Sequence, residues 1–427
     1  MEKKITLNHI TKIEGHASLN LGIKDGKVTV CELGSTEGAR YFEGLVLGRK
    51  YYEAHEMTSR ICGICSSAHV IAAVSAIENA IGFTPSEQTL KLRALLTLGE
   101  RIRSHATHLY FLALPDYLGY ESAIAMAPKY KKELKMALKM VKVGNHMVSL
   151  FGGRDLHPVS ECVGGWLKVP KQEELDELIK MLQRIKADTI KTCKLFFSFK
   201  IPNLKGGGLW FSISEPDRYV ILQGRFCSGN KCYDPAIYNN FLREYHNDYS
   251  TANFVVKDEK RYLLGALARL NNNYKFLSKD AKRMLDKSKL KLPTTNPFAN
   301  NLAQAIELVH AIDHSIEICK NTKINPKDIV KEFPAPRAGV GVGAIEAPRG
   351  TLFHEYELDN EGKIIRANII TPTAQNLLNM QEDIRNFVPS IVNKSRDKII
   401  LEIEKLIRSC DPCFSCSSHF LDVKWVE

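Results

Sequence analysis

Long runs of apolar residues at helical spacing dominate the first half of the chain. Apolar positions recur every three or four residues over residues 89–114, 122–151 and 171–199, the period of a helix with one buried face. The first run ends at Pro115 and the second at Gly152–Gly153, residues that interrupt helices. Three helices of this length predict an antiparallel bundle.

Alternating apolar and polar positions predict small sheets toward both ends of the sequence. Residues 5–35 contain a hairpin signal at Asp25-Gly26, and residues 346–373 contain a second turn at Asn360-Glu361-Gly362. The middle segment, 201–235, is rich in Gly, Pro, aromatic and β-branched residues and predicts short strands and loops. Further helical segments are expected over residues 43–83, 262–273, 300–320 and 379–411. The predicted fold class is therefore α+β, a central bundle of long helices with small peripheral β-sheets.

Composition narrows the class of protein. The 427 residues are 44% hydrophobic and 25% charged, the balance of a soluble globular protein. No run of 18 or more residues is apolar and free of charge, so no membrane span is expected. The N-terminus has no secretory signal, and we expect a cytoplasmic protein. The net charge of +11 comes from lysines spread along helical segments, which favours solvated helix faces over a nucleic-acid site.

The eleven cysteines divide into two groups. Without an export signal, a disulfide framework explains them poorly. Seven are isolated or nearly so, and small buried hydrophobes are the expected role; these are Cys31, Cys162, Cys193, Cys227, Cys232, Cys319 and Cys410. The other four form two C-x-x-C pairs, Cys62/Cys65 and Cys413/Cys416.

The two pairs have the same local form, C-x-x-C followed by a histidine. They lie in RICGICSSAH, residues 60–69, and in DPCFSCSSH, residues 411–419. Thiolates are soft ligands that suit zinc, nickel, copper and iron–sulfur chemistry. A zinc module usually closes a loop of roughly 15–20 residues between its pairs, whereas almost the whole chain separates these two. If they share one site, residues 1–427 form one interlocked domain.

At these residues the sequence closely resembles the large-subunit family of nickel–iron hydrogenases, which carries R-x-C-G-x-C-x-x-x-H and D-P-C-x-x-C-x-x-H near its two ends. The resemblance covers essentially the whole chain. Further landmarks are TKIEGH (11–16, with Lys12 where the family usually has Arg), RSHATH (103–108) through LPD (114–116), and EAPRG (346–350). Relatives in respiratory complex I have lost the metal cysteines, and all four are present here.

Segments such as LPDYLGY and TNPFANNLAQAIELV look like the cytoplasmic sulfhydrogenases and bidirectional NAD(P)-linked hydrogenases. The resemblance implies reversible heterolytic H2 oxidation within a heteromultimer. Electrons would pass to a small iron–sulfur subunit, then through flavin-containing diaphorase subunits to NAD(P). The alternatives are the deazaflavin-reducing and viologen-reducing enzymes. A different class is a zinc-bound, non-catalytic basic scaffold or nucleic-acid-binding protein.

The resemblance also implies residue roles. Nickel would be held by Cys62, Cys65, Cys413 and Cys416, with Cys65 and Cys416 bridging to an iron that carries CO and cyanide. Cys413 would be the first proton acceptor, and Glu14 would carry the proton onward.

The remaining roles surround the metals. Arg349 would lie over the open metal position, and Asp116 and Asp411 would pair with it or fix it. Pro348 and Thr373 would line the diatomic ligands, and His69 would donate to a bridging sulfur.

Two expectations concern the C-terminus. Glu43 and His419 match a family magnesium site, although Glu43 lies in a divergent stretch, residues 39–43. The family is cut after the final histidine by a maturation protease, so residues 420–427 are expected to be a propeptide of an uncut precursor. The alternative is a permanent tail.

Overall fold

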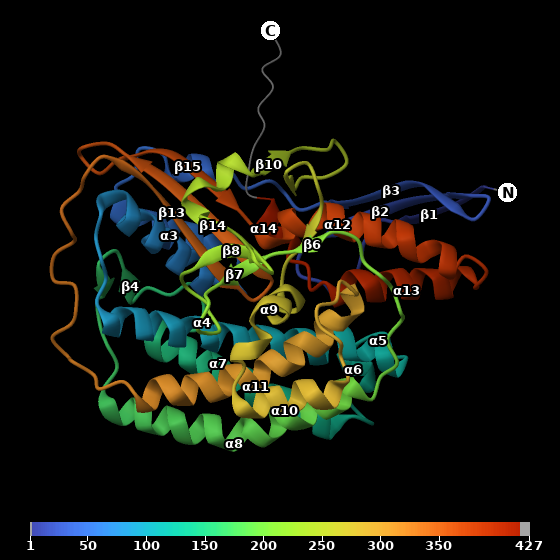
Figure 1. The fold of residues 1–427 in the computed structure, drawn as a ribbon, viewed down its shortest axis with the longest axis horizontal. Coiled ribbons are helices and arrows are strands. Elements are labelled where there is room, and N and C mark those ends of the chain that lie inside the picture. Colours follow the sequence, from blue (N-terminus) through green and yellow to red (C-terminus); the bar gives the residue numbers. More distant parts are fainter. Residues whose placement is uncertain (1, 419–427) are drawn as a thin grey trace, which may run out of the picture.

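A bundle of long helices forms one layer of the protein, and sheets with further helices form the other (Figure 1). The computed structural model describes residues 2–418. The long helices of the bundle are α4 (Glu87–Thr107), α7 (Lys131–Gly152), α8 (Gln172–Phe197) and α11 (Asn300–Lys320). Helix α4 packs against α7 and α11, and α8 packs against α11 and α7. The predicted α+β class and central bundle are confirmed.

Two three-stranded antiparallel sheets lie in the other layer. The first has the order β1 (Glu2–Leu7), β2 (Ala17–Lys24), β3 (Lys27–Ser35), and the second β13 (Gly339–Ala347), β14 (Gly350–Leu358), β15 (Ile364–Ile370). Asp25 and Gly26 form the β2–β3 turn with positive φ angles, as a D-G hairpin turn requires. The β14–β15 connection spans residues 359–363, so both predicted hairpins are confirmed.

The remaining elements are shorter or connect these layers. The helices are α1 (Phe42–Val46), α2 (Ala54–Thr58), α3 (Ser66–Ile81), α5 (Leu114–Leu118), α6 (Ala123–Met126), α9 (Ala266–Asn273), α10 (Lys279–Ser288), α12 (Pro372–Phe387), α13 (Arg396–Ser409) and α14 (Phe414–Ser417). The strands are β4 (Glu161–Cys162), β5 (Gly165–Trp166), β6 (Leu209–Trp210), β7 (Ser212–Ser214), β8 (Arg225–Ser228), β9 (Lys231–Tyr233), β10 (Leu242–Tyr245), β11 (Phe254–Lys257) and β12 (Tyr262–Leu263). No helix within residues 2–418 has both the length and the apolarity to cross a bilayer.

Several predicted helices are broken in the structure. The segment from Glu43 forms only short helices before α3, which ends at Gly82 in the left-handed conformation (φ 72°). Pro389 lies in a single 3-10 turn between α12 and α13, because proline supplies no backbone donor. Helix α4 continues through a π-helical segment, His108–Ala113, into α5. The predicted end at Pro115 was therefore wrong, since a proline is tolerated in the first turn of a helix.

One expectation about the cysteines was also wrong. Cys227 and Cys232 are opposite each other on the antiparallel strands β8 and β9, and they form a disulfide with an S–S distance of 2.04 Å. The sequence separates them by a tight turn, whose hairpin register brings the two side chains together. Cys31, Cys162 and Cys193 are buried thiols, as expected.

Strand β13 lies directly on helix α3 because one face of the strand is made of glycine. A β-carbon on Gly341 would lie 2.1 Å from the backbone oxygen of Ala76, and Gly339 and Gly343 approach the same helix equally closely. No side chain fits at such distances. This contact fixes the start of α3, which follows Cys65, relative to the turn between β13 and β14.

Replacing Gly341 with alanine should force α3 and β13 apart. Overpacking against backbone costs about 1–3 kcal/mol, so we expect G341A to lower the Tm of the purified complex. Gly38→Ala is the matched control, because no atom lies within 4 Å of a β-carbon there. Equal Tm values for G341A, G38A and the parent would show that the close approach is not a constraint.

Candidate metal centre

The four cysteines of the two C-x-x-C pairs meet at one buried site. Cys62 and Cys65 lie in the turn before α3, and Cys413 and Cys416 lie at the start of α14 and within it. The four Sγ atoms all lie within 4.8 Å of one another. The closest approaches between the pairs join Cys62 to Cys413, at 3.6 Å, and Cys65 to Cys416, at 3.2 Å.

One arginine joins the two cysteine segments. The Nη2 atom of Arg40 donates to the carbonyl of Ile61, at 2.8 Å, and to the carbonyl of Ser415, at 2.6 Å. The first carbonyl precedes Cys62 and the second precedes Cys416. The backbone N–H of Arg40 also donates to the carbonyl of Ser418. A single guanidinium group therefore holds both cysteine turns in a fixed relation.

Glu14 contacts the second cysteine pair through both its backbone and its side chain. Its carbonyl accepts from Phe414 N at 3.0 Å. The thiol of Cys413 donates to Glu14 Oε2 at 2.9 Å, and the hydroxyl of Ser415 donates to Oε1. Burial raises the pKa of Glu14, and the charge of Cys62 raises it further. The carboxyl group is half-buried, so it lies between the cysteines and solvent.

The N-terminus of α3 serves a carboxylate. Ser67 N and Ala68 N donate to Glu100 of α4, at 2.7 and 3.2 Å, while Cys62 Sγ accepts from Ile64 N and Cys65 N. Burial raises the pKa of Glu100 to about 7. Sequence reasoning missed Glu100, although a charged residue within the apolar run of α4 was a usable signal.

The four thiols fit a bound metal cation. Burial raises the pKa of both Cys413 and Cys416, whereas hydrogen bonds from Cys413 and then Cys416 hold the pKa of Cys62 well below its ordinary value. Thiols in mutual contact cannot all ionise without a neighbouring positive charge. A soft or borderline metal ion supplies that charge and accepts four thiolate ligands.

Arg349 supplies a positive charge at the same site. It lies in the two-residue turn between β13 and β14, is 5% exposed, and its Nη2 lies 3.1 Å from Asp411 Oδ1. Its Nε and Nη1 atoms have no hydrogen-bond partner among residues 2–418. Burial lowers the pKa of Arg349, but the charges of Asp411 and then Cys413 raise it to a net value well above the ordinary one. Unpartnered N–H groups in a buried position fit a ligand bound beside the cysteines.

The turn that carries Arg349 is held by a second buried arginine. Arg269 of α9 donates to the carbonyls of Ala347 and Pro348, at 3.0 and 2.8 Å. It also pairs with Glu307 at 2.6 Å and with Glu346 at 2.9 Å. Each charge of this cluster is compensated, as a buried charge requires. Sequence reasoning did not identify Arg269, because its partners are far from it in the chain.

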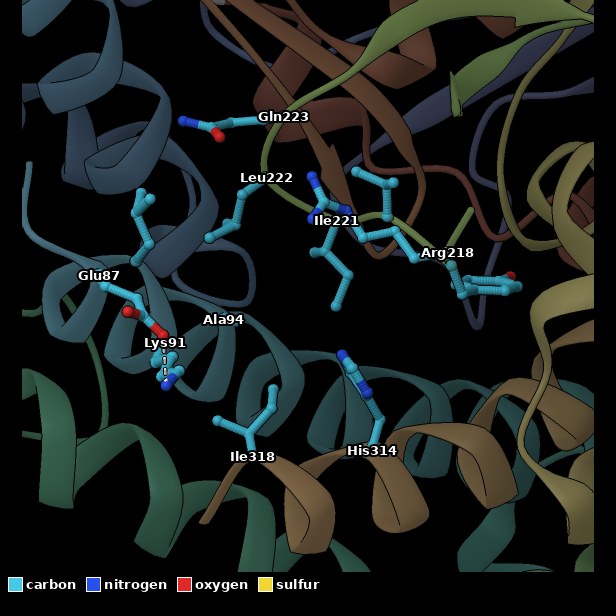
Figure 2. A pocket seen from close by; sticks show the side chains of 12 residues that line it. Glu87, Lys91, Ala94, Arg218, Ile221, Leu222, Gln223, His314 and Ile318 are labelled. Carbon is cyan, nitrogen blue, oxygen red and sulfur yellow. Dashed lines mark ion pairs between the residues drawn. The ribbon is translucent and has the colours of Figure 1, made fainter. Parts of the chain in front are cut away.

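A pocket of about 320 Å³ lies between α4, α11 and the loop 218–223, and none of its lining residues is a cysteine (Figure 2). His314 and Ile221 point into it. Tyr219, on its wall, donates to Glu307 at 2.6 Å. The pocket is therefore separate from the cysteine site and reaches it only through the buried cluster around Arg269.

The other predicted residues have different surroundings. Asp116 pairs with Lys12 and with Arg408, the latter at 2.8 Å, so its described ion pairs are not with Arg349 as one expectation had it. The reason is that α5 places Asp116 beside the N-terminal segment and α13. Thr373 Oγ1 accepts from Cys413 N at 2.8 Å, which places it against the second cysteine turn.

His69 and the proposed magnesium ligands complete the set. His69 Nδ1 lies 3.0 Å from His354 Nε2, a buried residue that sequence reasoning missed. Its predicted donation to a sulfur stays a prediction. Glu43 Oε1 accepts from Ile369 N at 2.8 Å. His419 and the tail 420–427 lie outside the described residues, so the magnesium site and the propeptide stay predictions.

Sequence comparisons identify a family and several relatives. A family model for nickel-dependent hydrogenases matches residues 40–139 and 239–419. The alpha chain of sulfhydrogenase 1 from Pyrococcus furiosus is 35% identical over 422 residues, which cover 97% of each chain. A protein of the F420-non-reducing hydrogenase vhu from Methanococcus voltae is 31% identical over 415 residues, 90% of this chain and 97% of the relative.

Solved structures share the fold. An NAD+-reducing NiFe-hydrogenase in its H2-reduced state superposes with a TM-score of 0.87 at 24% identity, covering 98% of this chain and 99% of the other. The NiFeSe-hydrogenase of Dm. baculatum superposes with a TM-score of 0.81 at 22% identity, covering 98% and 100%.

Removing the guanidinium that joins the cysteine turns should impair metal retention. Residues that orient metal ligands typically change metal affinity by about 10- to 100-fold, so we expect R40A to retain about tenfold less nickel after dialysis against a chelator. Arg243→Ala is the control, since Arg243 is exposed and pairs with Glu259 on the surface. Equal nickel content in R40A and R243A would contradict this role for Arg40.

Proposed function

Because this chain belongs to the nickel-dependent hydrogenase family, as its catalytic large subunit, we propose that it oxidises H2 reversibly and passes the electrons through an iron–sulfur partner subunit to NAD(P). The observation that carries the proposal is the meeting of four buried thiols from the two ends of the chain beneath Arg349. The test is metal analysis and infrared absorption on the complex purified without oxygen. About one nickel and one iron on this subunit, with CO and cyanide bands, are expected. Zinc without these bands on a matured chain would favour the zinc-bound scaffold instead.

Cys62, Cys65, Cys413 and Cys416 would hold nickel, and Cys65 and Cys416 would also hold iron. The 3.2 Å approach of these two sulfurs supports their sharing a second metal. Pro348 and Thr373 would lie beside the diatomic ligands of the iron. When bound, such a centre polarises H2 and takes up its electron pair, which leaves the protein to receive the proton.

The proton path would run from Cys413 to Glu14. The Sγ–Oε2 distance of 2.9 Å is within the range for direct transfer. The raised pKa of Glu14 brings its carboxyl group closer to the pKa of a group that exchanges protons near neutrality. Ser415 holds Oε1 and leaves the group oriented toward Cys413.

Arg349 would stabilise negative charge that develops beside the thiolates, because its guanidinium is buried and stays protonated. Asp411 holds one edge of that guanidinium. Asp116 would act at a distance, since its pairs with Lys12 and Arg408 connect the Glu14 segment to α13.

Electrons would leave across the face beside Cys62 and Cys65. Gly63 and Ile64, between the two ligands, are only half-buried. Arg103 donates to the carbonyls of both Ile64 and Asp155, which places the exposed Leu156 (44%) beside this loop. An exposed apolar side chain next to the metal ligands supports docking of the iron–sulfur subunit here.

NAD(P) as the final acceptor is supported by the sulfhydrogenase relative and by the fold shared with an NAD+-reducing enzyme. The second candidate is an F420-non-reducing, viologen-type complex, because a relative of that name is 31% identical; a deazaflavin acceptor is the third. H2-dependent reduction of NAD+, NADP+, deazaflavin and viologen by the intact complex separates these acceptors. Reduction of viologen alone would remove the NAD(P) proposal and leave the hydrogenase in place.

Maturation would follow the family pattern, with a protease removing residues 420–427 in the cytoplasm once the metals are installed. Ser418 is anchored just before this tail, through Ser35 Oγ at 2.7 Å and Thr251 Oγ1 at 3.2 Å. His419 and Glu43 would then bind magnesium. The intact mass of active enzyme tests the cleavage, and a chain that ends at Glu427 would contradict it.

Substituting Glu14 with glutamine should block the proton path while it preserves the hydrogen bonds. General acid–base groups contribute about 10²- to 10⁴-fold, so we expect E14Q to lower H2 oxidation by at least about 100-fold with unchanged nickel and iron content. Glu32→Gln is the control, a half-buried glutamate of β3 that should retain the parental rate. A fully active E14Q enzyme would mean that protons leave by another route.

A charge at Leu156 should weaken the complex. Burying a carboxylate in an interface leaves it unpaired, and we expect L156E to recover at least about tenfold less iron–sulfur subunit on affinity purification through this chain. Ile124→Glu is the control, because Ile124 is 86% exposed on α6. Equal recovery for both variants would place the interface elsewhere.

A further inference from the structure

His108 is a buried histidine whose two ring nitrogens both face oxygen atoms. It lies at the start of the π-helical segment between α4 and α5 and is 1% exposed. Its Nδ1 lies 2.5 Å from Gln304 Oε1, and its Nε2 lies 2.7 Å from the carbonyl oxygen of Arg408. A carbonyl oxygen only accepts hydrogen bonds, so Nε2 donates to Arg408.

The orientation of Gln304 decides the role of Nδ1. The amide nitrogen of Gln304 donates to Asp411 Oδ2 at 2.8 Å. Reversing the amide would place its oxygen against a carboxylate that is paired with Arg349, which brings two acceptors together. The amide oxygen therefore faces His108, and Nδ1 must donate as well. A neutral imidazole donates from only one nitrogen, whereas an imidazolium donates from both.

The groups around His108 favour the charged ring. The carbonyl of Arg408 lies in the last turn of α13, the negative end of the helix dipole. Asp411 Oδ1 lies 4.0 Å from Nε2. The opposing factors are burial and two cations, but Arg408 is itself paired with Asp116 and Glu404, and Arg349 lies beyond Asp411.

We propose that His108 is a permanently charged positioning residue for Arg349. As an imidazolium it fixes Gln304 and Asp411, and Asp411 fixes the guanidinium. The three charged groups then carry one net positive charge next to the thiolates, whereas a neutral His108 would leave a neutral Arg349–Asp411 pair. This inference rests on the role proposed above for Arg349 in the hydrogenase.

The charge state can be measured without activity. We would record imidazole ¹⁵N spectra of the complete complex with ¹⁵N-histidine in the catalytic chain, assigning His108 by the signal lost in His108→Gln. Both nitrogens of His108 are expected to carry protons from about pH 6 to about pH 9, where an ordinary histidine loses its charge. His310 is the internal reference, because burial lowers its pKa to about 3 and keeps it neutral. One unprotonated nitrogen on His108 at neutral pH would overturn the proposal, even if the complex is a fully active hydrogenase.

Kinetics test the consequence for the reaction. Misplacing a catalytic group costs up to about 100-fold, so H108Q, which keeps one donor but no charge, should lower kcat at least about tenfold with an unchanged KM for H2. His108→Lys restores a positive charge and should recover part of the rate at equal nickel content. Equal loss in both folded, nickel-loaded variants, or no loss in H108Q, would overturn the charge mechanism. If H108Q does not fold, the spectrum of the parent, with the signal assigned by H108K, still decides the charge state.

Discussion

Four sulfur atoms from opposite ends of the chain must lie within 4.8 Å of one another, and most features near the site serve that requirement. The glycine face of β13 sets the position of α3 and thus of the first cysteine turn. Arg40 and Glu14 bind the second turn to the first and to the N-terminal segment. Because thiols in contact repel one another when ionised, this framework holds them together until a metal is bound.

Burying a metal centre also commits the fold to burying charges around it. Each ion taken from water costs several kcal/mol unless it is paired, so one buried charge calls for the next. Arg349 pairs with Asp411, and Asp411 is reached by Gln304 and His108. A separate cluster around Arg269 holds the backbone of the Arg349 turn. These groups come from α4, α9, α11 and α13, which explains why the helix bundle is part of the site as well as its support.

The sequence predicted the bundle, both hairpins and the meeting of the cysteine pairs, because helical and strand periodicity and C-x-x-C spacing are local signals. It did not predict the breaks in the helices, since a proline or a short turn acts differently in each context. It paired Asp116 with Arg349, whereas the fold pairs Asp116 with Lys12 and Arg408. It also missed the disulfide of Cys227 and Cys232, which depends on hairpin register.

The sequence by itself therefore determined the type of chemistry: four soft ligands in two matched motifs, a carboxyl group in the N-terminal motif and an arginine in a third. These assignments depend on residue identity and short spacing, which a chain carries without folding. Only the tertiary structure decided which charges face one another, as with Arg40 across the two turns and His108 between two oxygens. Such contacts join residues distant in sequence, and their strength depends on distances of a few tenths of an ångström and on exclusion of water.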